Sequence, residues 1–401
     1  MEDDLPVLLL YCQHSVGIGH LRRSIAVVEP LAQYFRVVFL NGGRFPDAIL
    51  RPSNIEFIDL PPLGMEADGK LVTRVQGCDV AEAKNRRRKM IMDTYLRLQP
   101  AVVLIELFPF GRKKFAFELL PLLRAAKRSD PKPLVVCSLR DILVDGRDDQ
   151  QYFDDRARWL TDRYFDAVLV HTDPKFAKLD ESFRPSRPLK TPLFYTGFAL
   201  ADDTDNGNSN IDSQPGIVVS AGGGIVGTGL LHAAVEAQPR LCGKLNASMT
   251  IVAGPFLPEI DWLSLTRFAR KRPGLTLYRS VPNLRHLLKN AKVSISQCGY
   301  NTVMDLLQAQ VPALVIPYSE GQENEQSKRA EKLAGLGMVR ILEESELNPD
   351  NMITQLEALC SSTNRRHGFD MDGCKQTRNV IIQLAEARKT EAEEVTSGTM
   401  A

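Results

Sequence analysis

Two glycine-rich turns are the parts of this sequence whose residue types and spacing suit chemistry on a phosphorylated ligand. SVGIGHLRRS, at residues 15–24, follows the apolar run VLLLYC, and SAGGGIVGTG, at residues 220–229, follows a similar run in the second half. Glycine lets a buried strand turn tightly into a helix, and the N–H groups at a helix start favour an anion. We predict that both turns face one ligand cleft, with Gly17, Gly19 and Arg22 beside a phosphate or a second substrate.

His20 is the residue of the first turn that can move a proton. It comes directly after the second glycine, where the helix starts. The positive end of the helix dipole lowers the pKa of an imidazole, so the ring stays neutral near pH 7 and can accept a proton. We therefore predict a general base here. A structural or capping histidine is the alternative.

Neither turn has the pattern of the common nucleotide-binding motifs. No Gly-Lys-Ser or Gly-Lys-Thr follows, which excludes a Walker A loop, and the first turn lacks the third glycine of the dinucleotide fingerprint. The seven cysteines are scattered without a Cys-x-x-Cys pair, so neither a zinc site nor a disulfide framework is predicted. We expect no resident cofactor and no bound metal.

A further cluster of polar residues lies at 294–333. The stretch reads as strand, glycine turn, helix, strand, polar loop and helix. Asp305 falls early in the first of these helices and off its apolar stripe, where a carboxylate can accept hydrogen bonds from two ribose hydroxyls. Glu325 and Gln326 open the last helix, and their side chains suit sugar hydroxyls. A plain acidic residue near a helix start is the alternative for Asp305.

The elements that must position these residues follow one pattern in both halves. Short runs of Val, Ile and Leu recur between longer helix-like segments, and their apolarity is continuous instead of alternating. Such strands are buried on both faces, which is typical of a parallel sheet covered by helices. We predict an α/β fold of two Rossmann-like, doubly wound domains that face a shared cleft.

A polar stretch rich in Asp, Asn, Gly and Ser separates the two halves. Residues 201–216 cannot bury a face, so we predict a linker there, between a first domain at 1–200 and a second at 217–374. A helix at about 375–392 is expected to pack back on the first domain, and residues 393–401 are expected to form a flexible tail.

Composition and charge narrow the class of protein. With 44% hydrophobic and 25% charged residues and a formal net charge of +1, the chain is typical of a soluble globular protein. No basic strip with stacking aromatics suggests nucleic-acid binding. The N-terminus is acidic where a signal peptide would be basic, so no signal peptide is predicted. No apolar run approaches the roughly 18 residues of a membrane-spanning helix, and we expect a cytoplasmic protein.

One basic and apolar stretch suits contact with a membrane surface. LFPFGRKKFAFELLPLLRAAKR, at 107–128, interleaves Phe and Leu with Arg and Lys. Such a segment can rest on an anionic bilayer, which would place the protein peripherally at the inner face of the membrane. A packing helix with basic edges is the alternative.

The second half resembles the C-terminal domain of glycosyltransferase family 28. The resemblance lies in the order glycine, threonine, valine, acid in GYNTVMD, in PALVIPY after it, and in the paired polar residues that open a helix. It covers residues 216–345 and, locally, the GIGH turn. It implies a GT-B fold of two domains, a UDP-sugar donor held mainly by the second domain, inversion at the anomeric carbon and no metal.

The same resemblance assigns roles to single residues. His20 matches the histidine proposed as general base, and Asp305 falls where the family has a glutamate on the donor ribose. Gln326 matches the second residue of a Gln-Gln pair that reads the donor sugar, whereas Glu325 replaces the first and leaves the identity of that sugar open. The resemblance implies further donor-binding residues. Gly222, Gly223 and Gly224 match the glycine loop near the diphosphate, and Val281 lies where backbone groups read the uracil. Gly299 and Thr302 belong to the turn over the nucleotide.

The function favoured is an inverting, metal-independent glycosyltransferase that moves a sugar from a UDP-sugar to an acceptor hydroxyl. The acceptor stays open, with a lipid-linked or glycolipid acceptor as one candidate. A UDP-sugar 2-epimerase of the same fold is a second enzyme class, in which acid and base groups would come from His20, Glu106, Asp141 and Glu325. A nucleotide-sugar-binding subunit without turnover is a third alternative.

Overall fold

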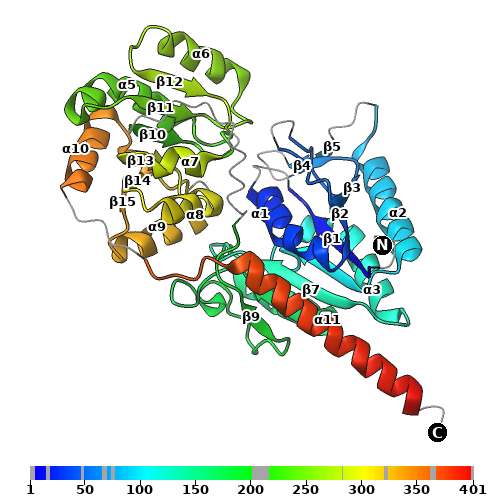
Figure 1. Cartoon of the computed structure of the whole chain (residues 1–401). Coiled ribbons are helices and arrows are strands. Elements are labelled where there is room, and N and C mark those ends of the chain that lie inside the picture. Colours follow the sequence, from blue (N-terminus) through cyan, green and yellow to red (C-terminus); the bar gives the residue numbers. More distant parts are fainter. Residues whose placement is uncertain are drawn as a thin grey trace.

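The computed structural model shows two α/β domains (Figure 1). The described residues are 5–14, 19–46, 49–65, 70–73, 77–200, 216–281, 283–319, 324–361 and 367–398. Residues 201–215 of the predicted linker lie outside them. The predicted fold class is confirmed, because each half builds its own parallel sheet with helices packed against it.

The first domain contains, within the described residues, a parallel sheet in the order β3-β2-β1-β6-β7-β8-β9. Its strands are β1 (Val7–Cys12), β2 (Arg36–Asn41), β3 (Ile55–Asp59), β6 (Val102–Glu106), β7 (Leu134–Leu139), β8 (Ala167–Val170) and β9 (Leu193–Tyr195). Its helices are α1 (Gly19–Val28), α2 (Val80–Leu98), α3 (Ala116–Arg128) and α4 (Gln150–Tyr164), and β4 (Leu63–Met65) pairs with β5 (Leu71–Thr73) in a separate antiparallel hairpin. Every residue of β6, β7 and β8 is buried, as continuous apolarity predicts.

The second domain repeats this plan with the strand order β12-β11-β10-β13-β14-β15, again parallel. Its strands are β10 (Ile217–Ser220), β11 (Met249–Val252), β12 (Leu275–Tyr278), β13 (Val293–Ser296), β14 (Ala313–Val315) and β15 (Val339–Ile341). Its helices are α5 (Thr228–Leu245), α6 (Glu259–Ala269), α7 (Leu284–Lys289), α8 (Tyr300–Ala309), α9 (Glu325–Gly335) and α10 (Pro349–Cys360). In both sheets the first strand lies in the interior, which places the two glycine turns at switch points of the strand order.

The long helix α11 (Gly373–Gly398) leaves the second domain and runs along the first (Figure 1). Its buried side chains Cys374 and Ile381 join the apolar cluster that contains Leu21 of α1. The helix continues to Gly398, so residues 393–398, expected in a flexible tail, are helical. Glu393 and Glu394 have high helix propensity and favour the first part of this extension, whereas the residues after them do not.

The stretch 107–128 packs into the first domain instead of presenting an apolar face. Phe108, Phe110 and Phe115 are at most 2% exposed, and the leucines of α3 that face the sheet are buried with them. Its lysines and arginines, apart from Arg112, are exposed. The alternative of a packing helix with basic edges therefore describes this segment, because Phe108, Phe110 and Phe115 are buried in the core and Phe117 packs against it.

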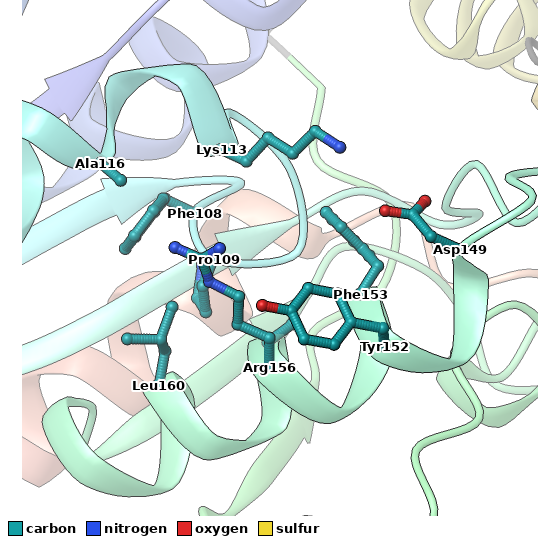
Figure 2. A pocket seen from close by; sticks show the side chains of 10 residues that line it. Phe108, Pro109, Lys113, Ala116, Asp149, Tyr152, Phe153, Arg156 and Leu160 are labelled. Carbon is teal, nitrogen blue, oxygen red and sulfur yellow. The ribbon is translucent and has the colours of Figure 1, made fainter.

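A small cavity lies between this segment and α4 (Figure 2). Its volume is about 60 Å³. It is lined by Phe108, Pro109, Lys113, Ala116, Asp149, Tyr152, Phe153, Arg156, Ala157 and Leu160. Pockets that enclose organic ligands have volumes of roughly 300–1,000 Å³, so this cavity is small for a sugar site.

Candidate functional site

The candidate site lies where α1, the helix after the first glycine turn, meets α8 of the second domain. Asn301, in the first turn of α8, donates a hydrogen bond from Nδ2 to the carbonyl oxygen of Gly19, the first residue of α1, at 3.1 Å. Both helices follow strands of their own sheets, β13 and β1. The carboxyl ends of the two sheets, where such folds bind ligands, therefore lie next to each other.

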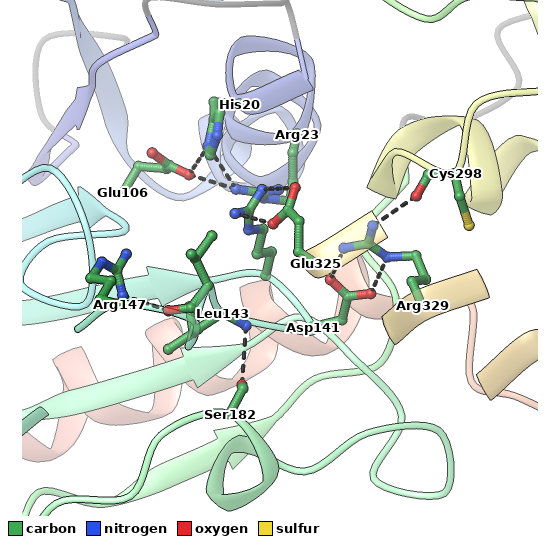
Figure 3. A network of polar contacts seen from close by, with 12 residues as sticks. His20, Arg23, Glu106, Asp141, Leu143, Arg147, Ser182, Cys298, Glu325 and Arg329 are labelled. Carbon is green, nitrogen blue, oxygen red and sulfur yellow. Dashed lines mark hydrogen bonds and ion pairs between the residues drawn. The ribbon is translucent and has the colours of Figure 1, made fainter. Parts of the chain in front are cut away.

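His20 forms a pair with Glu106 at the centre of this region (Figure 3). The imidazole Nδ1 lies 2.5 Å from Glu106 Oε1, and Arg23 Nη2 donates to the same oxygen at 2.5 Å. Glu106 is the last residue of β6 and is fully buried, whereas the His20 side chain keeps 16% of its exposure. The pairing leaves the other ring nitrogen of His20, Nε2, for a substrate.

Burial and nearby charges decide the protonation of this pair. Burial lowers the pKa of His20 to about 3, a shift that Glu106 opposes and Arg112 reinforces. Burial by itself would raise the pKa of Glu106, but His20, Arg23 and Arg112 outweigh it and hold that pKa well below its ordinary value. At neutral pH the carboxylate is ionised and the ring is neutral. Nδ1–H then donates to Glu106, and Nε2 is an unprotonated acceptor.

Stability is expected to fall in mild acid because two buried histidines stay neutral in the fold. Burial lowers the pKa values of His20 and His171 from 6.5 to about 3. Between these values the unfolded chain binds more protons, so the free energy of unfolding decreases as pH falls below 6.5. The loss is at most about 1.4 kcal/mol per pH unit for each histidine.

Urea denaturation at pH values from about 7.5 to 5 tests this expectation, because most carboxylates stay ionised over that range. The His20→Asn variant should show a shallower slope than the unchanged protein, since it lacks one of the histidines whose pKa burial lowers. A free energy of unfolding that is constant over the range would contradict the assignment of neutral buried rings.

The second glycine turn follows β10 and is shaped by backbone that only glycine adopts easily. Gly222 and Gly224 have φ of +58° and +89°. A Cβ on Gly224 would lie 2.7 Å from the carbonyl oxygen of Ala253, whereas one on Gly222 would meet only Gln297 and Thr302, at 3.8 Å. The turn therefore packs closely against β11 on one side and leaves room on the side that faces Thr302.

Asp305 lies on α8 beside Arg285 of α7. Arg285 Nε and Asp305 Oδ1 are 3.4 Å apart. Arg22 of α1 approaches from the other domain: burial lowers the pKa of Arg22, and the charge of Asp305 opposes that shift. The predicted ribose-binding carboxylate is thus flanked by two guanidinium groups. Arg22, predicted beside a phosphate, lies within electrostatic reach of Asp305, and Arg23 is the arginine beside His20.

Glu325 and Gln326 make different contacts at the start of α9. Arg140, just after β7, donates from Nη1 to Glu325 Oε1 at 2.7 Å across the domain interface. Gln326 Oε1 accepts from the backbone N–H groups of Cys298 and Tyr318, at 3.1 and 3.3 Å. The Gln326 carbonyl thereby ties the ends of β13 and β14 together, which leaves its amide N–H₂ for a ligand.

The remaining predicted residues frame the same region. Gly223 lies between the two glycines of positive φ, Gly299 caps the start of α8, and Val281 is buried in the apolar core that also contains Val303. Gly17 lies outside the described residues. None of these placements tests the predicted contacts with a donor, which stay predictions.

Sequence analysis did not predict the ion pairs that several charged residues of the site form. Sequence analysis gives Glu106 and Asp141 only as acid and base groups for an epimerase, offers Arg23 only as the alternative to Arg22 beside a phosphate, and gives Arg140 and Arg329 no role. Each carboxylate follows or ends a buried strand, and this position is the signal that was open to sequence analysis. Their partners could not be read from it, because His20 and Glu106 are separated by 86 residues.

In the described part of the chain, no group of three or more His, Cys, Asp or Glu side chains is arranged to hold a metal ion. No helix among the described residues is long and apolar enough to cross a membrane.

The second half matches a known family. Residues 225–384 match the glycosyltransferase family 28 C-terminal domain, which confirms the resemblance. A curated relative is the UDP-N-acetylglucosamine--N-acetylmuramyl-(pentapeptide) pyrophosphoryl-undecaprenol N-acetylglucosamine transferase of Lactococcus lactis subsp. cremoris (strain MG1363). It is 21% identical over 173 residues, which are 43% of this chain and 48% of that protein. The chain thus spans about half the length of this curated relative.

Solved structures share the fold over nearly the whole chain. The calicheamicin glycosyltransferase CalG4 superimposes with a TM-score of 0.60 at 16% identity, and the match covers 98% of each chain. The UDP-GlcNAc 2-epimerase of Methanocaldococcus jannaschii gives a TM-score of 0.58 at 13% identity, over 94% of this chain and 99% of that one. At such identities the likeness establishes the GT-B architecture of both domains and no more.

Proposed function

We propose that this chain, whose residues 225–384 form a glycosyltransferase family 28 C-terminal domain, transfers a sugar from a UDP-sugar to an acceptor hydroxyl. The observation that carries the proposal is the His20–Glu106 pair next to that domain. A neutral imidazole with one nitrogen held by a carboxylate and the other unprotonated can accept a proton from a hydroxyl. Burial weakens the ring as a base, and the charge of Glu106 opposes that effect by favouring the imidazolium that forms during the reaction.

The proposed reaction is a single displacement. His20 Nε2 takes the proton of the acceptor hydroxyl while its oxygen bonds to the anomeric carbon, and the bond from that carbon to the UDP oxygen breaks. Attack opposite to the leaving group inverts the anomeric centre. The negative charge that appears on UDP is stabilised by the N–H groups of the glycine turn and of the first turn of α5, so no metal ion is required in this mechanism.

The donor is proposed to bind the second domain. Its diphosphate would lie at Gly222, Gly223 and Gly224, and its ribose at Asp305, whose carboxylate it would share with Arg285. The sugar would meet Glu325 and the Gln326 amide. Because Arg140 already neutralises Glu325, that carboxylate can accept hydrogen bonds from hydroxyls without an unpaired buried charge.

The location of the reaction is also a proposal. None of the seven cysteines is in a disulfide, and five of them are buried, which supports a reducing, cytoplasmic environment. A lipid-linked acceptor would bring the protein to a membrane surface. The exposed lysines and arginines of 107–128 would then contact anionic lipid electrostatically, without insertion of the buried phenylalanines.

Donor binding by calorimetry against UDP-, GDP-, TDP- and ADP-sugars tests the proposal. We expect selective binding of one UDP-sugar, and at least about tenfold weaker binding by Asp305→Ala, because the ribose loses a charged hydrogen-bond acceptor. Glu357→Ala, which removes an exposed carboxylate of the same domain, serves as the matched control. Absence of binding across the panel would overturn the UDP-sugar assignment.

A UDP-sugar 2-epimerase is the second candidate, since a solved epimerase shares the fold. Its carboxylates would have to act as acids and bases, yet Glu106, Asp141 and Glu325 each form an ion pair with arginine. These pairs favour the transferase. Release of UDP that requires an acceptor would establish transfer, whereas a changed sugar on intact UDP-sugar would establish epimerisation, and donor binding without either would indicate a binding subunit.

A further inference from the structure

Arg112 is a nearly buried cation of the His20 site whose hydrogen-bonding capacity is unused. Its side chain is 12% exposed, and its contact with a carboxylate is the long one between Nε and Glu106 Oε2, at 4.0 Å. Neither of these two atoms has a hydrogen-bond partner. Nε of Arg112 is thus a buried charged donor without a partner among the described residues, which is costly.

The backbone holds Arg112 in this place at a further cost. Leu107 and Arg112, which flank the turn after β6, have φ of +65° and +57°, in the left-handed region that residues with a side chain seldom adopt. Gly111 closes the turn with a hydrogen bond to the carbonyl oxygen of Leu107 at 2.9 Å, and a Cβ there would lie 2.8 Å from the Leu107 side chain. Strained backbone of this kind concentrates at ligand sites.

The surroundings of Arg112 carry positive charge. Its charge acts on His20 and on His14, so the guanidinium lies towards the carboxyl end of β1. Arg23 and Arg112 contribute two positive charges against one from Glu106, while His20 is neutral, so the cluster is left with one uncompensated positive charge. Lys113 and Lys114 follow in sequence and are exposed.

We propose that Arg112 binds an anionic group, phosphate or carboxylate, of the acceptor beside the hydroxyl that His20 deprotonates. A guanidinium can donate two parallel hydrogen bonds to either group, which fixes orientation as well as position. The group would supply the missing negative charge and hold the acceptor hydroxyl at His20 Nε2. This inference rests on the proposed function, because only an acceptor would occupy the His20 side of the site.

Titration of the protein with small anions tests the proposal without an acceptor in hand. Protein labelled with ¹⁵N at histidine is saturated with UDP, so that added anions cannot occupy the glycine turn, and is titrated with inorganic phosphate or with acetate. We expect saturable shifts of the His20 ring signals with at least one anion. Arg112→Gln should weaken that binding about tenfold or more, as expected for a charged hydrogen bond. The anion that binds more tightly identifies the acceptor group.

Two controls make each outcome decisive. Lys114→Gln removes a neighbouring exposed charge and should change anion binding less than about twofold, since screening weakens exposed charges. Arg112→Lys keeps the positive charge but lacks the forked donor, so its anion affinity should lie between those of the unchanged protein and Arg112→Gln. This variant also tests the proposal if Arg112→Gln fails to fold. Equal anion binding by Arg112→Gln and the unchanged protein, or no binding by either, would overturn the proposal.

A loss of UDP affinity in Arg112→Gln would assign Arg112 to the donor diphosphate instead of the acceptor. If the unchanged protein binds phosphate at Arg112 but not UDP, the proposed donor fails while the anion site stands. The two failures are therefore distinguishable.

Discussion

Replacing His20 with asparagine is expected to lower the transfer rate about 100- to 10,000-fold, the usual loss when a general base is removed. Asparagine can still hydrogen-bond to Glu106, whose Oε1 lies 2.5 Å from His20 Nδ1, but it cannot take up a proton from the acceptor. The affinity for UDP should stay the same, because the donor is proposed to bind the second domain. The expected result is thus a loss in kcat with donor binding retained.

The rate of UDP release at saturating donor measures this effect, with an acceptor found by screening hydroxyl compounds and with UDP affinity from calorimetry. Glu106→Gln provides a graded comparison. It keeps a partner for Nδ1 but removes the charge that favours the imidazolium formed during transfer, so we expect a smaller loss than in His20→Asn. A His20→Asn variant within threefold of the unchanged rate would show that His20 is structural.

Replacing Asp141 with asparagine is expected to destabilise the protein by about 3–5 kcal/mol, the cost of breaking a buried ion pair by removing one partner. Arg329 of α9 donates to Asp141 through Nε and Nη2, at 2.6 and 2.8 Å, and both side chains are fully buried. Burial by itself would lower the pKa of Arg329, but Asp141 outweighs it and keeps the guanidinium charged. Without Asp141, a cation is left buried at the contact between the two domains.

The two tryptophans allow the effect to be assigned to each domain. Trp159 lies on α4 of the first domain and Trp262 on α6 of the second, so variants with a single tryptophan report urea unfolding of one domain at a time. In Asp141→Asn we expect the urea midpoints of both domains to decrease. The two midpoints should also differ from each other, because the interface no longer couples the unfolding of the domains.

The double variant Asp141→Leu with Arg329→Met is the control for this prediction. Replacing both charges with apolar groups is often neutral or stabilising, so we expect it to recover most of the loss. If Asp141→Asn alone leaves both midpoints unchanged, the pair does not stabilise the interface.

Sequence patterns predicted the elements of the fold well because burial of consecutive residues is a local property. The run VLLLYC coincides with β1 and RVVFLN with β2, and the runs before both glycine turns are strands of the two sheets. A strand buried on both faces must be apolar along its whole length, so its sequence reports its surroundings directly. The extent of α11 was missed, since a polar, charged segment can equally be helical or frayed.

Part of the candidate site was predicted because the positions of some of its residues also depend on the local sequence. The position of His20 after a glycine turn follows from local geometry, and so does that of Asp305 on the first turns of α8. The stretch 107–128 shows the limit of this reasoning. Its pattern of phenylalanines and basic residues fits both a membrane surface and a packed segment, and only the packing of α3 against the sheet decides between them.

By itself, then, the sequence determined two parallel-sheet domains, the two glycine turns and the residues that follow each strand. Tertiary structure alone decided which charges meet: Glu106 with His20, Arg140 with Glu325 and Asp141 with Arg329, separated by 86, 185 and 188 residues. The reason is physical. Whether a residue is buried depends on its close neighbours in the chain, whereas the partner of a buried charge depends on how strands are ordered and how two domains dock.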